Sequence, residues 1–258
     1  MDATQRFSDR AEVYHLFRPR YPDELLGLLR EKCGLNSKAV VADIGSGTGI
    51  LAELFLRNGN VVFGVEPNEA MRVMAERQLA KFAGFRSVDG RAEATTLASE
   101  SADFVVAGQA FHWFDRERAA AEFARILRPE GWIILVWNER LTDASPFAGD
   151  YEQLLLDSSI DYRAVDPKQV SGDREALDQF FRKQGNFAAY RHTMPVTFEQ
   201  LSGFLSSASY APTAGHPKHG PMMEQLRSIF ETHQRSGVVP LEFDMKVYYG
   251  RRFELGRA

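Results

Sequence analysis

Three glycines at alternate positions, Gly45, Gly47 and Gly49, constrain the fold of this chain more than any other feature of its sequence. They follow an apolar, β-branched run at 39–44, and a helical pattern of apolar residues begins at Ile50. A strand, a glycine turn and a helix in this order bring backbone N–H groups and a helix N-terminus against a nucleotide-like ligand. The sequence therefore predicts an α/β protein with a ligand site at this turn.

A carboxylate at the end of the next apolar run supports the same interpretation. The run 60–65 leads into Glu66, about twenty residues beyond the first glycine. At that spacing an acidic side chain after the second strand can accept hydrogen bonds from ribose hydroxyls. The turn and the acid together predict a ribose-containing ligand.

The spacing of the glycines separates two classes of ligand. Dinucleotide-binding proteins carry G-x-G-x-x-G, whereas this chain has G-x-G-x-G with Asp43 just before it. The pattern resembles motif I of the class I S-adenosylmethionine (SAM) dependent methyltransferases. That resemblance implies SAM as the cofactor, S-adenosylhomocysteine as its product, and a set of cofactor-binding residues. The set is Asp43, Gly45, Ser46, Gly47 and Gly49 at the methionine part, and Glu66 and Pro67 at the ribose.

Repeated strand–helix units predict the fold. Strands are expected at 39–44, 61–65, 85–88, 102–108 and 132–137, with helices at 50–58, 69–83 and 116–127 between them. Units of this length predict a doubly wound, mostly parallel sheet. Two later strands, 187–198 and 241–253, are expected to form an antiparallel pair at its edge. The helical stretches 141–184 and 199–235 are expected to cap the ligand cleft.

The domain organisation follows from this order of elements. We expect residues 1–138 to form the N-terminal helices and the SAM-binding α/β core. Residues 139–258 are expected to supply the cap and the two strands that complete the same sheet.

Composition narrows the class of protein and its partners. Net charge is −4 over 258 residues and no basic block recurs, so we expect no nucleic-acid partner. No apolar run approaches the ~20 residues of a membrane span, and the start lacks a signal core. One cysteine excludes an intramolecular disulfide and suits a reducing compartment. We expect a cytoplasmic monomer or homodimer that acts on a small molecule and binds no metal.

The segment before the first strand contains Tyr14 and Arg18, which share a face if it is helical. The form Tyr-x-x-x-Arg-Pro-x-Tyr-Pro is similar to segments that fold over the cofactor in small-molecule methyltransferases. The resemblance implies that Tyr14 and Arg18 reach the cofactor carboxylate, for which the arginine fork is suited. A solvated surface helix is the alternative.

Two later strand exits also resemble this group. Ala92 and Glu93 follow the third strand, where relatives hold the adenine edge, although Arg91 stands where an acid is common. The run Gln-Ala-Phe-His-Trp-Phe-Asp at 109–115 is similar to a motif of trans-aconitate methyltransferase-like proteins, within the methyltransferase type 11 group. The resemblance implies that Gln109 and Phe111 contact the cofactor; the alternative is that the aromatic rings pack against the next helix.

The predicted reaction is methyl transfer from SAM to a small-molecule acceptor, with a carboxylate among the acceptors considered. In-line displacement from an activated donor depends mainly on alignment, and a carboxylate acceptor needs no general base. His112 is the candidate base, with a packing role as the alternative, and Tyr210 is a candidate acceptor contact. A nicotinamide-dependent oxidoreductase and a non-catalytic SAM-binding protein of the same fold remain open as alternatives.

Overall fold

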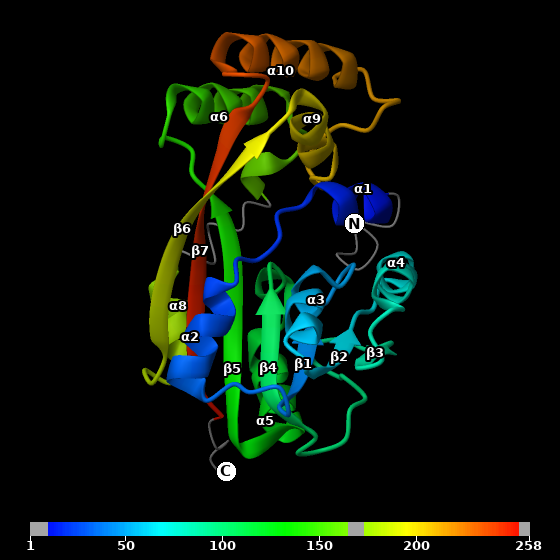
Figure 1. Cartoon of the computed structure of the whole chain (residues 1–258), viewed down its shortest axis with the longest axis vertical. Helices are drawn as coiled ribbons and strands as arrows, with labels where there is room; N and C mark the ends of the chain where they lie inside the picture. The colour runs from blue at the N-terminus through cyan, green and yellow to red at the C-terminus, as the bar shows by residue number, and fades with distance from the viewer. Residues whose placement is uncertain (1–9, 165–172, 253–258) are drawn as a thin grey trace.

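The computed structural model describes residues 10–164 and 173–252. A central sheet stands below a group of helices (Figure 1). The strands are β1 (Val40–Ile44), β2 (Val61–Val65), β3 (Phe85–Val88), β4 (Ala102–Gly108), β5 (Leu127–Arg140), β6 (Asn186–Val196) and β7 (Val239–Arg251). The α-helices are α1 (Ala11–Phe17), α2 (Glu24–Cys33), α3 (Ile50–Arg57), α4 (Glu69–Leu79), α5 (Arg116–Ile126), α6 (Pro146–Ser158), α8 (Arg174–Phe180), α9 (Phe198–Ser206) and α10 (His219–His233). Two 3₁₀ turns, η3 (Phe111–Trp113) and η4 (Tyr162–Ala164), complete the described elements.

The sheet confirms the predicted fold class. Its strand order is β3-β2-β1-β4-β5-β7-β6, with β1 to β5 parallel to one another. Strand β7 pairs antiparallel with both β5 and β6. The order reverses between β1 and β4, which is the switch point where open α/β sheets bind their ligands.

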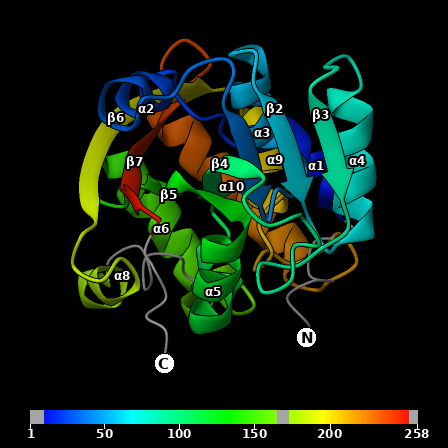
Figure 2. The same cartoon turned by 90° about the horizontal axis from the view of Figure 1, so that it is seen from below.

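Helices cover both faces of the sheet, because its central strands are apolar on both sides. Helices α2 and α3 lie on one face, and α5 and α8 on the other (Figure 2). Alternate residues of the same strand serve the two cores: Val41 belongs to the first, and Ala42 and Ile44 to the second. The doubly wound arrangement is thus built from the period-2 alternation of strand side chains.

The cap is smaller than the sequence suggested. Helices α6, α9 and α10 share a third apolar core with the upper ends of β6 and β7 and stand above the sheet (Figure 1). Helix α8 was predicted as part of this cap, and that was wrong. Its Leu177 and Phe180, with the following Phe181, are buried in the second core beside α5. The apolar face of α8 formed by these side chains therefore packs against the sheet and α5 instead of the cap.

Local signals for helix boundaries agree with the structure where a capping side chain is present. Asn68 accepts a hydrogen bond from the Met71 amide at 3.1 Å, and Asp115 accepts one from the Arg118 amide at 3.2 Å. Helix α4 ends at Leu79, earlier than the predicted 83.

Strand β5 extends to Arg140 because β7 pairs with it along most of its length, so the predicted boundary at residue 138 falls inside a strand. The part of the chain that the structure describes contains no helix long and apolar enough to cross a membrane.

Candidate functional site

A cavity of about 520 Å³ opens where β1, β2, β4 and β5 end, and it extends up to the cap. Thirteen of the fifteen predicted site residues line it, which brings together segments more than a hundred residues apart in the sequence. They are Tyr14, Arg18, Asp43, Gly45, Ser46, Gly47, Glu66, Pro67, Ala92, Glu93, Gln109, His112 and Tyr210. Gly49 and Phe111 do not line it.

The glycine turn uses its amides inside the protein. The N–H groups of Gly45 and Ser46 donate to the carbonyl of Val65 at 2.8 and 3.1 Å, and that of Gly47 donates to Glu66 Oε2 at 2.9 Å. These three amides are therefore not directed at a ligand, unlike the amides of a turn that cradles a pyrophosphate. The expectation that the backbone N–H groups of this turn face the ligand is corrected for these three.

Gly45 could not be replaced by another residue without strain. Its φ is +68°, and a Cβ on it would lie 2.7 Å from the Cβ of Ala110. The turn therefore lets β1 and the segment after β4 approach each other below the cavity.

Glu66 connects the turn to helix α4. Its Oε1 accepts from the Asn68 amide at 2.9 Å while Oε2 holds Gly47, and the side chain is buried. Burial raises the pKa of Glu66, and the two backbone amides oppose that shift. Each carboxylate oxygen retains acceptor capacity beyond its single amide, as a contact with two hydroxyls requires.

Asp43 is a buried carboxylate at the floor of the cavity. It is 1% exposed, and among the described residues neither oxygen has a hydrogen-bond partner of normal geometry. Burial raises its pKa to about 8, although the nearby Ala52 amide favours the charged form. A buried carboxyl group whose oxygens have no hydrogen-bond partner fits a site where a ligand supplies the missing donors.

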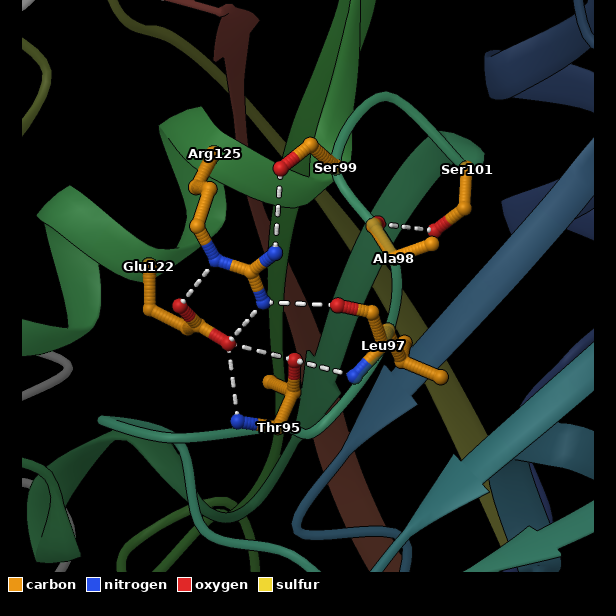
Figure 3. A network of polar contacts seen from close by, with 7 residues as sticks. All are labelled: Thr95, Leu97, Ala98, Ser99, Ser101, Glu122 and Arg125. Carbon is orange, nitrogen blue, oxygen red and sulfur yellow. Dashed lines mark hydrogen bonds and ion pairs between the residues drawn. The ribbon is translucent and has the colours of Figure 1, made fainter.

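A polar network fixes the segment after β3, which carries Ala92 and Glu93 (Figure 3). Glu122 Oε1, from α5, accepts from the amide and the hydroxyl of Thr95 at 2.8 and 2.6 Å. Arg125 pairs with Glu122 at 2.7 Å and donates to the carbonyl of Leu97 at 2.8 Å.

The protonation state of Glu122 agrees with this network. Burial would raise the pKa of Glu122, but its hydrogen bonds from Arg125 and Thr95 lower it to about 2. This network was not among the sequence predictions; its signal in the sequence is a Thr-Thr pair at 95–96 followed later by Glu-x-x-Arg at 122–125 on one helix.

The segment after β4 is held in an uncommon backbone conformation. Gln109 has φ of +55°, and its side-chain amide donates to the carbonyl of Asn138 at 2.7 Å. Phe111, in η3, does not line the cavity. Its ring is buried in the second core, 4.7 Å from the ring of Phe180. The predicted cofactor contact of Phe111 is therefore corrected to a packing role, the alternative that sequence analysis had kept.

His112 lines the cavity, and its Nδ1 is buried with no hydrogen-bond partner among the residues described. Burial lowers its pKa to about 4. The imidazole is neutral at pH 7 and a weak base, which favours a hydrogen-bonding role over proton abstraction.

The cap side of the cavity is formed by aromatic and cationic side chains. The guanidinium of Arg18 lies 5.0 Å from the Tyr14 ring and 5.4 Å from the Phe204 ring. The rings of Tyr210 and Tyr162 are 4.7 Å apart. Arg140, at the end of β5, lines the cavity beside them, with Nη2 3.4 Å from the hydroxyl of Tyr162.

Metal binding requires a cluster of side chains that can act as ligands to the ion. Between residues 10 and 164 and between 173 and 252, no group of three or more His, Cys, Asp or Glu side chains could hold a metal ion.

Comparison with known proteins identifies the family. A model described as a methyltransferase domain matches residues 42–135. An uncharacterized methyltransferase of Mycobacterium tuberculosis is 30% identical over 236 residues, covering 90% of this chain and 88% of the relative.

Solved structures share the fold. A candidate type II methyltransferase from Anaeromyxobacter dehalogenans has a TM-score of 0.67 at 22% identity, covering 92% of this chain and 99% of that one. A candidate SAM-dependent methyltransferase from Methanococcus maripaludis has a TM-score of 0.54 at 18% identity, covering 70% and 85%.

The sheet order, the cavity at its switch point and these matches define a methyltransferase built on an open α/β sheet. The chain belongs to the class I SAM-dependent methyltransferases.

Proposed function

We propose that this protein transfers a methyl group from SAM to a small-molecule acceptor that carries a carboxylate, by in-line displacement. The observation that carries the proposal is the single cavity that joins the strand ends to the cap. One end presents Asp43 and Glu66 and the other Arg140 and two tyrosines, so the cavity has distinct surfaces for a cofactor and an acceptor.

The residues of the lower end fit SAM. Glu66 has acceptor capacity for two ribose hydroxyls, and the unpartnered carboxylate of Asp43 fits a ligand with N–H donors. Gly47, at φ +54°, has open space where a Cβ would stand, which suits close approach of a ligand. Ala92 and Glu93 would lie at the adenine, and Tyr14 with Arg18 at the methionine carboxylate.

SAM supplies an electrophilic methyl group on a sulfonium when it is bound. The protein's contribution is alignment, for which the scale of the available effect is ~7–11 kcal/mol. The rings of Phe114 and Trp113 on the wall favour a cationic ligand, since a ring face attracts a cation by ~0.5–2 kcal/mol. His112 and Tyr210 would orient the acceptor, and a carboxylate acceptor needs no proton removed.

The structure also bears on the two alternative functions. Against a nicotinamide oxidoreductase, the first three amides of the glycine turn are used within the protein and do not cradle a pyrophosphate. The cavity extends to Ser209, Tyr210 and Phe243 of the cap side, and this room for an acceptor favours the enzyme over a non-catalytic SAM-binding protein.

Thermal unfolding with four ligands tests the proposal. SAM and S-adenosylhomocysteine at about one hundred times Kd should each raise Tm by roughly 5–10 °C, while NAD and NADP should not. Stabilisation by a nicotinamide cofactor in place of SAM would contradict the cofactor assignment. Methyl transfer is then measured by S-adenosylhomocysteine release with a panel of small acids.

A further inference from the structure

The segment that carries Tyr14 and Arg18 is short and only partly embedded in the protein. Helix α1 has seven residues, of which Ala11 and His15 are buried. A helix of this length is not stable by itself in water, so its position depends on tertiary contacts. The Nε of Arg18 is buried without a hydrogen-bond partner among the described residues, which fits a side chain whose partner is a ligand. The contacts that place this segment therefore also place part of the cavity wall.

Arg20, two residues beyond Arg18, connects this segment to helix α3. Its Nη2 lies 3.2 Å from His15 Nε2 and donates to the His15 carbonyl at 3.3 Å, and its Nη1 pairs with Glu53 at 3.4 Å. Burial and the charge of Arg20 lower the pKa of His15, which keeps the ring neutral at pH 7. Because a guanidinium only donates hydrogen bonds, His15 accepts through Nε2 and carries its proton on Nδ1.

The chain on either side of these contacts is also held. The side-chain amide of Asn138, near the end of β5, donates to the carbonyl of Arg20 at 3.4 Å. At the other end of the segment Ala11 packs against α4, and the ring of Phe17 lies so close to Gly203 of α9 that a Cβ there would have no room. Apolar packing thus fixes α1 to the cap and to α4, and Arg20 supplies polar contacts to α3 and β5.

We propose that Arg20, His15 and Glu53 form a clasp that positions Tyr14 and Arg18 for the carboxylate of the methionine part of SAM. None of the three clasp residues lines the cavity, so they are positioning residues and not ligand contacts. This inference rests on the proposed function, because that proposal places the methionine carboxylate at Tyr14 and Arg18. If the clasp opens, the affinity for the cofactor falls by the fraction of molecules that keep the competent arrangement.

A purely structural role for these contacts predicts a different result. The side chain of Arg20 is 45% exposed and that of Glu53 is 23% exposed, so their ion pair contributes little to the free energy of unfolding. Lys81 also pairs with Glu53, at 3.7 Å, so this carboxylate keeps a cation when Arg20 is replaced. Loss of the clasp should therefore change ligand binding much more than it changes stability.

Two ligands that differ in the methionine part test the clasp by titration calorimetry. S-adenosylhomocysteine carries the amino-acid carboxylate, whereas methylthioadenosine keeps the adenosine and the sulfur but lacks the amino acid. The wild type should bind S-adenosylhomocysteine about tenfold more tightly, or better, because only this ligand offers a charged acceptor to Arg18. Arg20→Gln should reduce this ratio roughly threefold, as when about a third of the molecules keep the competent arrangement. The Kd for methylthioadenosine should stay within about twofold, and the Tm without ligand within about 2 °C, of the wild type.

Glu53→Gln opens the clasp from the α3 side and is the second variant, in case Arg20→Gln does not fold. It should reduce the ratio in the same direction, by about twofold, because the contact between Arg20 and His15 remains. Arg30→Gln is the matched control. Arg30 is an exposed arginine of α2 that donates to Asn58 at the end of α3, at 2.6 Å, so it also connects a neighbouring segment to this helix.

Arg30→Gln should keep the wild-type ratio. An unchanged ratio in both Arg20→Gln and Glu53→Gln overturns the proposal, and so does an equal loss of affinity for the two ligands. Equal binding of the two ligands by the wild type also overturns it, because the methionine part would then make no favourable contact. Failure of the wild type to bind S-adenosylhomocysteine would instead contradict the proposed function.

Discussion

Glu66 shows how one side chain can organise a ligand site at the scale of single residues. It holds the glycine turn through Gly47 and the start of α4 through Asn68. In Glu66→Gln one oxygen becomes an NH₂ group that faces a backbone N–H, and the charged acceptor is lost. Losing a hydrogen bond to a charged group costs ~1.5–3 kcal/mol, so the Kd for SAM should rise roughly 10–100-fold in calorimetric titration.

The control for Glu66 lies three residues away. Glu69 is an exposed acid in the first turn of α4. Glu69→Gln should leave the Kd for SAM within about twofold of the wild type, because no ligand contact is removed. An unchanged Kd in Glu66→Gln would refute the ribose assignment.

Asp43 predicts a dependence of stability on pH. Its pKa is about 8 in the folded protein and near 3.8 in an unfolded chain. Between these values the folded state keeps a proton that the unfolded chain releases, so the stabilising contribution is full below about pH 4. That contribution is lost as the pH rises to about 8.

Asp43→Asn removes this dependence. The Tm of the variant minus that of the wild type should therefore be larger at about pH 8 than at about pH 5, measured by calorimetry without ligand. Asp178→Asn, at an exposed position of α8, is the control and should show no such trend. Should the Asp43 difference stay constant across this range, the carboxylate is not held protonated by burial.

At the scale of elements, α5 positions the segment after β3 through Glu122 and Thr95 (Figure 3). Glu122→Gln weakens its pairing with Arg125 and so loosens the wall that carries Ala92 and Glu93. The Kd for S-adenosylhomocysteine should rise about three- to tenfold, which corresponds to ~1 kcal/mol for one weakened hydrogen bond. Titration calorimetry measures it.

Glu117→Gln is the matched control on the same helix, since Glu117 is exposed in the first turn of α5. It should bind S-adenosylhomocysteine as the wild type does. Equal affinity in Glu122→Gln and Glu117→Gln would show that the network stabilises the fold without positioning the cofactor wall.

At the scale of the whole molecule, α8 decides how much of the later chain is cap. Phe180 packs at 4.7 Å from Phe111 and 6.5 Å from Phe123, in the core between α5 and the sheet. Phe180→Ala should cost ~3–5 kcal/mol and lower Tm by roughly 6–20 °C, as a core truncation does. Phe187→Ala, at a 40% exposed ring on the edge strand, should lower Tm much less. A large change in ligand affinity with little loss of Tm would instead place α8 in the cap.

The sequence by itself determined the elements of the α/β core and most of the cavity wall. Asn68 and Asp115 cap helices through hydrogen bonds within three residues, and the strands alternate with helices at a regular spacing. Such local signals are readable from one chain, and parallel strands with apolar faces leave few ways to assemble. The positions of Glu66 and of the glycine turn then follow from the ends of adjacent strands.

Only the tertiary structure decided which face each late element covers and which polar groups meet. Phe111 and His112 are neighbours in sequence, yet one ring enters the second core and the other lines the cavity. Glu122 and Thr95 form a hydrogen bond, and so do Gln109 and Asn138, across tens of residues, and Arg140 reaches Tyr151 through the docking of α6. Periodicity shows that a side chain is apolar or polar, but not which distant surface it contacts. That choice depends on packing between elements, to which one sequence gives no direct signal.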